Sequence, residues 1–331
     1  MMQRDLSSLA RYHVDEDYRK SEFPITRSKC FLAHAAVSPL PRSVADAMQQ
    51  YLLRASSEGQ FGYLHNAAVA QCRSSLADMV GANAKDISIS QSTSSALNIV
   101  ANSIDWQQGD QVLVASFDFP SNIAPWVSLR RRGVEIIFYK LTKSGHIDLD
   151  DIRRILTNRT RLVAVSTVNF LSGAQNDISG VSSILDGKQI LLSVDAIQSL
   201  GVLPTTVDGV DFLSAGAQKW LLEPQGIGVL YVSPECRGQL NPPTVAWNNV
   251  SIEEPGGLKS HCDARKFESG SPNAVGIVGL EAALSLIGGI GVSAIAGHVD
   301  LLSTALKERL IKLGFLVQGG SNIVSFRSPL A

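Results

Sequence analysis

The sequence predicts an α/β protein with a mainly parallel sheet of about seven strands and helices on both of its faces. Short segments rich in Val, Ile and Leu alternate with segments in which apolar residues recur at helical spacing. Residues 161–166 and 190–194 are mostly apolar, which is typical of strands buried on both faces of a parallel sheet. Because ligands of such sheets bind at the carboxyl ends of the strands, polar residues at those ends are the functional candidates.

The composition is that of a folded globular protein. Of 331 residues, 45% are hydrophobic and 18% are charged, and the net charge is −1. This charge gives no electrostatic reason to expect nucleic acid or an anionic membrane as a partner. The four cysteines are widely spaced, which argues against a disulfide framework or a zinc site. Since the N-terminus lacks an apolar signal segment and no run of ~18 apolar residues is present, we expect a cytoplasmic protein.

A lysine in an apolar setting is the strongest chemical signal. Lys219 lies between small residues and an apolar run in residues 215–222, whereas lysine normally lies on a polar surface. A desolvated lysine is suited to forming a Schiff base with a carbonyl, as it does with pyridoxal phosphate. That cofactor also needs a carboxylate at its ring nitrogen, and Asp195 follows the strand at 190–194. The amide of Gln198 could bond the ring's phenolic oxygen. The alternative is a core strand followed by an ordinary lysine.

These residues resemble the class V aminotransferase superfamily of fold type I pyridoxal-phosphate enzymes. That superfamily includes cysteine desulfurases, carbon–sulfur lyases, kynureninases and an isopenicillin N epimerase. Its pattern is a strand, then Asp–x–x–Gln, then a small residue, His and the lysine. Here Gln218 replaces the histidine, and Gly216 stands where many members have a phosphate-binding serine. The resemblance implies that Asp195, Gln198 and Gln218 contact the cofactor.

Two hydroxyl-rich segments are candidates for binding the cofactor's phosphate. Residues 91–95 contain four consecutive hydroxyl side chains before an apolar helix, and a helix N-terminus attracts anions. Simple N-capping by a serine is the alternative explanation. The resemblance assigns the phosphate to Thr93 and Ser94. Residues 265–273 are similar to the superfamily's Arg–x–Phe–Glu–x–Gly–Thr–Pro–Asn, which implies that Ser271 reaches the phosphate of the other subunit.

Three further residues follow from the same resemblance. Phe119 stands where desulfurases have a histidine that stacks on the cofactor ring, and kynureninase-like members have a similar Phe–Pro. An aromatic ring can cover the cofactor but cannot act as an acid or base. An Asn or Gln near the ring oxygen is expected at Asn169, although the desulfurase spacing points to Phe170. His34 is a second-tier candidate.

We expect three parts in the chain. Residues 1–29 form an arm, residues 30–260 a large cofactor-binding domain, and residues 261–331 part of a small C-terminal α/β domain. This small domain is apparently truncated, since relatives continue with an arginine for the substrate carboxylate and, in desulfurases, a cysteine loop. Ser43 is the expected N-cap of the first long helix. Residues 233–259 are expected to form a loop that crosses to the partner of a homodimer.

The main hypothesis is a pyridoxal-phosphate enzyme that acts on an amino acid through a Lys219 Schiff base. Transamination, β-elimination at sulfur as in a desulfurase or carbon–sulfur lyase, and racemisation remain open. A second hypothesis is a catalytically impaired relative, motivated by Gln218, Gly216 and the short C-terminus. A third, a nucleotide-binding doubly wound module, lacks a glycine fingerprint after any early strand.

Overall fold

A seven-stranded sheet forms the centre of the computed structural model, which describes residues 9–60, 66–254 and 256–328. The strand order is β1-β7-β6-β5-β4-β2-β3. Only β7 is antiparallel to its neighbours, β1 and β6, and the other pairs are parallel. The predicted α/β fold with a mainly parallel sheet is therefore confirmed. The strands are β1 (Ile87–Ser90), β2 (Gln111–Ala115), β3 (Glu135–Tyr139), β4 (Thr160–Ser166), β5 (Leu191–Asp195), β6 (Phe212–Gly216) and β7 (Gly228–Val232).

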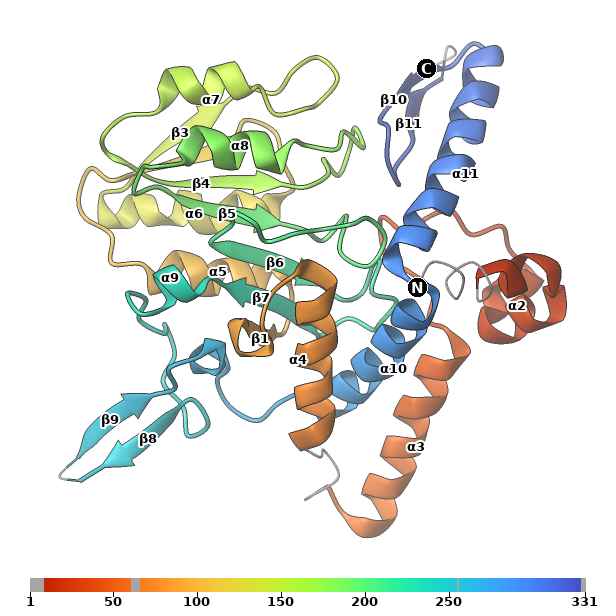
Figure 1. Ribbon diagram of the computed structural model, residues 1–331, viewed down its shortest axis with the longest axis horizontal. Coiled ribbons are helices and arrows are strands. Elements are labelled where there is room, and N and C mark those ends of the chain that lie inside the picture. Colours follow the sequence, from red (N-terminus) through yellow and green to blue (C-terminus); the bar gives the residue numbers. More distant parts are fainter. Residues whose placement is uncertain (1–8, 61–65, 255, 329–331) are drawn as a thin grey trace.

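Helices cover both faces of this sheet (Figure 1). One face packs against α4, α7, α8 and α10, and the other packs against α5, α6 and α9. Of these helices, α5, α6, α7 and α8 are the crossover connections between successive strands from β1 to β5, which is why these strands can run in one direction. Their bounds are α4 (Asn66–Val80), α5 (Thr93–Ser103), α6 (Ala124–Val127), α7 (Leu149–Ile155), α8 (Ile178–Leu185), α9 (Pro234–Arg237) and α10 (Ala274–Ile290).

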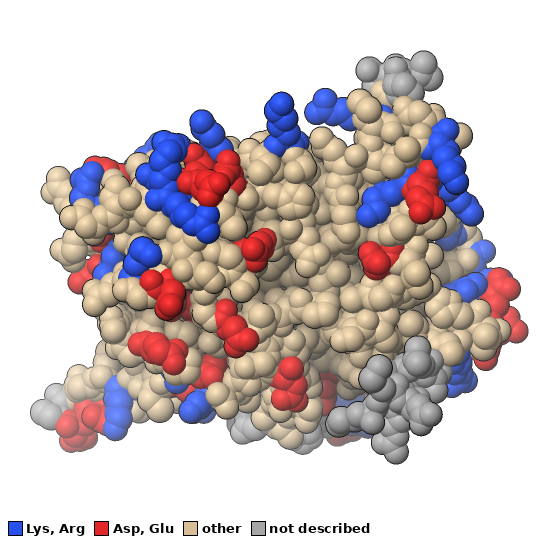
Figure 2. Space-filling view, turned by 45° about the horizontal axis from the view of Figure 1, so that its top comes forward, with Lys and Arg blue, Asp and Glu red and all other residues tan. Residues whose placement is uncertain are grey.

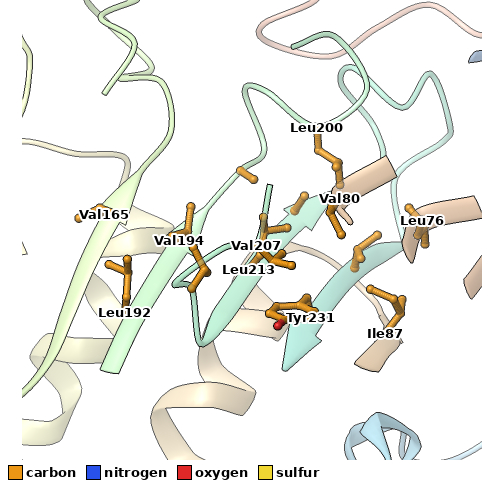
Figure 3. Close-up of a cluster of buried hydrophobic side chains, with 14 of the residues drawn as sticks. Leu76, Val80, Ile87, Val165, Leu192, Val194, Leu200, Val207, Leu213 and Tyr231 are labelled. Carbon is orange, nitrogen blue, oxygen red and sulfur yellow. The ribbon is translucent and has the colours of Figure 1, made fainter. Parts of the chain in front are cut away.

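The core explains why the central strands are apolar on both sides. Leu192 and Val194 of β5 point into the cluster on the first face, together with Leu213 and Tyr231 (Figure 3). Alternate residues of the neighbouring strands, such as Leu162, face the second cluster. Burying each such side chain stabilises the fold by about 1.5–3 kcal/mol. The core thus holds the strands in register, so that their carboxyl ends lie along one edge of the sheet.

The N-terminal arm docks through a small number of polar and aromatic contacts. It contains α2 (Glu16–Glu22) and a 3-10 turn at Pro24–Arg27, and α3 (Arg42–Glu58) follows. The expectation that Ser43 caps α3 is wrong, because the helix begins at Arg42 after Pro41. Instead, the backbone N–H and hydroxyl of Ser43 both donate to the carboxylate of Glu22 in the arm.

Two segments after β7 depart from the main sheet. Residues 233–259 were expected to be a loop, but they include β8 (Val250–Glu253), which pairs with β9 (Gly257–Ser260) in a hairpin that projects from the body (Figure 1). The base of this hairpin is held by buried Asn249, whose amide donates to the carbonyl of Lys266 at 3.0 Å. Farther on, α11 (Val292–Lys312), β10 (Leu316–Gln318) and β11 (Ser325–Arg327) lie beside the carboxyl ends of the central strands.

The division at residue 260 stays a prediction. Helix α10, which follows that position, contributes Ile277 and Leu280 to the core of the main sheet. Charged side chains of both signs are mixed on the face shown in Figure 2, as the small net charge leads one to expect. Within the described ranges no single helix is both long and apolar enough to cross a membrane; α10 and α11 meet that test only together, and they are bent by 75°.

Glu223 is an isolated acid in the core. Its residue is 1% exposed, and neither carboxylate oxygen has a hydrogen-bond partner among the described residues. A Cβ added at Gly279 of α10 would lie 3.1 Å from Glu223 Oε1 and 3.0 Å from the sulfur of Met48 in α3. Burial in this apolar helix interface raises the pKa of Glu223 to about 8. The protonated form is therefore favoured at neutral pH.

We predict that Glu223→Gln removes a pH-dependent loss of stability. Because the folded-state pKa lies above the ordinary value of 4.5, folding binds a proton and stability falls as pH rises from 4.5 to 8. Below pH 4.5 the variant and the wild type should have similar free energies of unfolding. At pH 8 the variant should be more stable by about 4 kcal/mol. Urea unfolding across this range tests the prediction, and a constant difference between the two proteins would contradict it.

Candidate active site

Lys219 lies in a short turn directly after β6, at the carboxyl edge of the sheet. The turn is fixed at its start by the Ala217 N–H, which donates to the Ile227 carbonyl at 3.0 Å. Lys219 is 8% exposed, as the sequence predicts for a lysine held in a pocket. Burial lowers its pKa, and the nearby Asp195 carboxylate opposes that change. A lowered pKa increases the fraction of the neutral amine, which is the nucleophilic form.

Asp195 ends β5, next to the strand that leads to Lys219. Its carboxylate is buried and accepts a 3.0 Å hydrogen bond from the Ile197 N–H. Burial raises the pKa of Asp195 to about 7; the Ile197 hydrogen bond opposes this rise, and the nearby Asp118 carboxylate adds to it. A cation placed against Asp195 would offset the cost of burying its charge. The site thus has the electrostatic requirement of a carboxylate that binds a protonated ring nitrogen.

Thr93, one of the phosphate candidates, lies in the first turn of α5. The hydroxyl of Thr93 is buried and has no hydrogen-bond partner in the described part of the chain. A Cβ at Gly216 would lie 3.1 Å from Thr93 Oγ1 and would overlap Oε1 of Gln218. The Gln218 side chain therefore fills the space that a residue larger than glycine would occupy at position 216. An orphaned hydroxyl and a carboxamide converge at a helix N-terminus, which fits a phosphate group.

Ser94 and Ser271 lie on the surface. The Ser94 hydroxyl is exposed and lies 2.7 Å from the Ser121 hydroxyl, whereas the neighbouring Thr93 is buried. Ser271 is exposed in a turn that Glu268 holds to β1, since the Ile89 N–H donates to that carboxylate at 2.8 Å. That Ser271 reaches the phosphate of another subunit stays a prediction.

Aromatic rings form one wall of the site. The Nζ of Lys219 lies 5.5 Å from the ring centroid of Phe119, which is 43% exposed. The Phe119 ring makes an edge contact with Phe170 at 5.4 Å, and Phe170 stacks on Phe117 at 5.7 Å. The structure therefore brings the predicted stacking residue and the lysine together, with Phe170 supporting the stacking ring.

The two predicted amides have structural partners. Gln198 accepts from the Trp220 indole at 2.8 Å and donates to the Ala35 carbonyl at 3.0 Å, which leaves one amide hydrogen for a ligand. The Asn169 oxygen accepts from the Leu171 and Ser172 backbone N–H groups and from the Ser172 hydroxyl. Its amide nitrogen donates to the Phe117 carbonyl at 3.3 Å. Asn169 thus shapes a turn, and its contact with the cofactor stays a prediction.

His34 packs beside this group through its aromatic neighbours. Its ring stacks on Trp220 at 5.8 Å and meets Phe31 edge-on at 5.2 Å. Burial lowers its pKa, so the neutral imidazole is favoured. His34 therefore positions Trp220 next to Gln198.

Sequence reasoning missed the carboxylate of Asp118. It precedes Phe119 after β2 and is buried with Ser166 and Asn122. The signal was available, because an acid directly after an apolar strand lies at the same edge as Asp195. Its partners were not visible, since they come from two different elements.

Two surface pockets differ in their relation to the site. A pocket of about 220 Å³ lies next to the aromatic wall and is lined by Phe117, Asn169 and Gln318, among others. A larger one, about 380 Å³, lies at the amino ends of β4 and β5 near Thr160 and Ile190. The larger pocket is at the opposite edge of the sheet from Lys219 and contains none of the predicted site residues.

The family model for aminotransferase class V matches residues 30–326. The chain belongs to this family. It is 31% identical to a probable cysteine desulfurase of Methanothermobacter thermautotrophicus over 291 residues, which are 86% of this chain and 72% of that protein. The structure of an apo cysteine desulfurase from Thermococcus onnurineus NA1 matches with a TM-score of 0.85 and 27% identity, covering 95% of this chain and 82% of that one.

Another matching structure carries pyridoxal phosphate. A lysine variant of C-DES has glycine covalently linked to pyridoxal phosphate, and it matches with a TM-score of 0.86, 94% of this chain and 87% of that one. At 22% identity, this match shows the fold alone. Pyridoxal phosphate is the cofactor of the class V enzymes, and the buried pair of Lys219 and Asp195 with the orphaned Thr93 hydroxyl fits it.

We predict that Thr93→Val weakens pyridoxal phosphate binding without destabilising the cofactor-free chain. The variant loses a hydroxyl that has no partner in the described chain, so its removal costs no internal hydrogen bond. A hydrogen bond to a charged phosphate is worth about 1.5–3 kcal/mol, so the dissociation constant should rise about tenfold or more. Fluorescence titration with pyridoxal phosphate measures it.

Ser103→Ala is the matched control, because Ser103 lies at the other end of α5 and donates to the Ile99 carbonyl at 2.7 Å. This control should leave the cofactor affinity unchanged. Equal affinities for the wild type and Thr93→Val would show that the Thr93 hydroxyl does not face the phosphate.

Proposed function

We propose that this protein is a pyridoxal-phosphate enzyme that acts on an amino acid and holds its cofactor on Lys219. The observation that carries the proposal is the pairing of buried Lys219 with buried Asp195 at one edge of the sheet. Both groups are pushed toward their neutral forms, which costs free energy unless a ligand of matching charge and chemistry is present. Perturbed pairs of this kind are concentrated at functional sites.

When bound, pyridoxal phosphate supplies an aldehyde for an amine and a protonated ring that withdraws electrons from the reacting carbon. Asp195 accepts the proton of the ring nitrogen in a hydrogen bond and holds the ring in its charged form. Phe119 covers one face of the ring and excludes water. Thr93, Ser94 and Gln218 hold the phosphate, with Gln198 at the ring oxygen.

Lys219 has a second role once the substrate amine has taken its place. Its lowered pKa makes it a suitable base for the substrate α-proton near neutral pH. Such a base contributes about a hundredfold to ten-thousandfold in rate. The same amine can return the proton to a different atom, which is the step that transamination requires.

Carbon–sulfur cleavage is the second candidate, because the relative at 31% identity is a probable cysteine desulfurase. A desulfurase needs a reactive thiolate to accept sulfur. Burial raises the pKa of Cys72 to about 12 and that of Cys236 to about 11, so these two thiols are not suited to that role. Cys30 and Cys262 are exposed. Elimination by a lyase needs no protein thiol, and product analysis separates the two reactions.

With cysteine as substrate, desulfuration yields alanine and protein-bound sulfane sulfur. Elimination yields pyruvate, ammonia and sulfide, and transamination consumes a keto acid and forms a new amino acid. Incubation with cysteine, with cystine and with pairs of amino and keto acids therefore assigns the reaction. A chain that binds the cofactor but turns over none of these would favour the catalytically impaired relative.

We predict that Lys219→Ala abolishes trapping of the cofactor. In the wild type, borohydride should fix pyridoxal phosphate on the peptide that contains Lys219 and bleach the visible absorption band. The variant should retain no covalent label and should lose turnover by at least about a hundredfold. Lys188→Ala is the control, because Lys188 bonds a helix carbonyl at Ile184 away from this edge. Full labelling of Lys219→Ala would overturn the proposal.

We also propose a homodimer in which Ser271 of one subunit completes the phosphate site of the other. Mixed dimers of Lys219→Ala and Ser271→Asp subunits test this arrangement. If Ser271 acts across the interface, each mixed dimer has one intact site, and random mixing restores roughly a quarter of the trapped cofactor of wild type. Each variant alone should trap little at limiting cofactor. No recovery on mixing would mean that Ser271 acts within its own subunit, and full trapping by Ser271→Asp alone would mean that Ser271 does not contribute to the phosphate site.

A further inference from the structure

A buried polar cluster lies behind the aromatic wall. Asp118 follows β2, Asn122 lies in the next turn, and Ser166 ends β4. The Ser166 hydroxyl donates to Asp118 Oδ2 at 2.6 Å, and the Asn122 amide donates to the same oxygen at 3.0 Å. The Phe119 N–H donates to the other oxygen at 2.7 Å. All three side chains of the cluster are less than 10% exposed.

The hydrogen bonds indicate that Asp118 carries a negative charge. The carboxylate accepts all three of these hydrogen bonds, whereas a protonated carboxyl group would have to use the Ser166 hydroxyl as an acceptor and would lose that donor. A carboxylate that accepts two or three such bonds is stabilised in its ionised form. Asn122 is itself oriented, because its oxygen accepts from the Trp126 indole at 3.4 Å. Burial opposes ionisation and raises the pKa of Asp118, so the three donors are what hold the charge.

This charge lies next to the carboxylate that faces the ring nitrogen. Ser166 pairs with Asp195 across β4 and β5, so Asp118, Ser166 and Asp195 form a row along the edge of the sheet. The charge of Asp118 raises the pKa of Asp195, and it also raises that of Tyr139 in β3. Lys219 has the opposite effect and lowers the pKa of Asp195. In a buried site these charges are weakly screened.

We infer that Asp118 is a positioning residue that keeps the cofactor's ring nitrogen protonated by adding a second negative charge behind Asp195. The inference rests on the proposed function, in which Asp195 contacts that nitrogen. Asp195 binds the proton of the ring nitrogen. The negative charge of Asp118 nearby stabilises this proton further, because it favours the positive charge of the protonated ring. Asp118 contacts neither the ring nor the substrate. It acts through Asp195 and, through the Phe119 N–H, on the orientation of the stacking ring.

The test is the titration of the ring nitrogen in the holoenzyme. The chain is reconstituted with pyridoxal phosphate labelled with ¹⁵N in the ring, and the ¹⁵N chemical shift is followed against pH. Asp118→Asn keeps the size of the side chain and removes its charge. We expect the midpoint to fall by about one pH unit, a tenfold loss of proton affinity. Ser166→Ala should lower it in the same direction by less, because it removes a donor that stabilises the Asp118 charge.

Asp211→Asn is the matched control. Asp211 is a carboxylate at the opposite end of the same strands, where it accepts from the Leu192 N–H at 2.8 Å, and its loss should leave the midpoint unchanged. An unchanged midpoint in Asp118→Asn would overturn the inference. If Asp118→Asn does not retain the cofactor, Ser166→Ala is used instead, and an unchanged midpoint in Ser166→Ala also overturns the inference. Failure of the wild type to trap cofactor on Lys219 would instead overturn the proposed function, before Asp118 is tested.

Discussion

The candidate active site depends on the free-energy cost of burying two ionisable groups at the carboxyl edge of the sheet. Lys219 and Asp195 are both desolvated there, and burial shifts the pKa of each toward its neutral form. Any ligand that supplies an aldehyde to the amine and a cation to the acid removes both penalties. Cofactor binding and folding stability are therefore thermodynamically linked in this chain.

The sequence predicted those parts of the site that depend on local order. A strand of apolar residues that ends in Asp195 must place this acid at the edge of the sheet, and Lys219 follows the next strand by the same logic. Thr93 was predictable because a helix N-terminus and its hydroxyls are adjacent in the chain. The seven-stranded sheet followed from the same alternation of buried strands and helices. In each case the order of strands, helices and polar residues along the chain was enough for the prediction.

The remaining features depend on side chains that meet across elements. Asp118 acquires its partners from Asn122 and from Ser166, which is 48 residues away. Glu223 is isolated only because α3 and α10 close over it. The β8–β9 hairpin has so little apolar alternation that its pairing could not be predicted, and its base depends on Asn249. No periodicity in the sequence reports such contacts, and the capping role expected for Ser43 failed for the same reason.

Gly216 and Gln218 both depart from the family pattern, and in the structure the two substitutions compensate for each other. Considered separately, Gly216 removes a side chain from the phosphate region and Gln218 replaces a histidine, which suggests a weakened site. In the structure, the Gln218 carboxamide enters the volume that the glycine leaves open and lies next to the unpartnered Thr93 hydroxyl. A larger residue at 216 would exclude the glutamine in this position. The pair thus keeps a polar side chain beside Thr93, and neither substitution alone argues against cofactor binding.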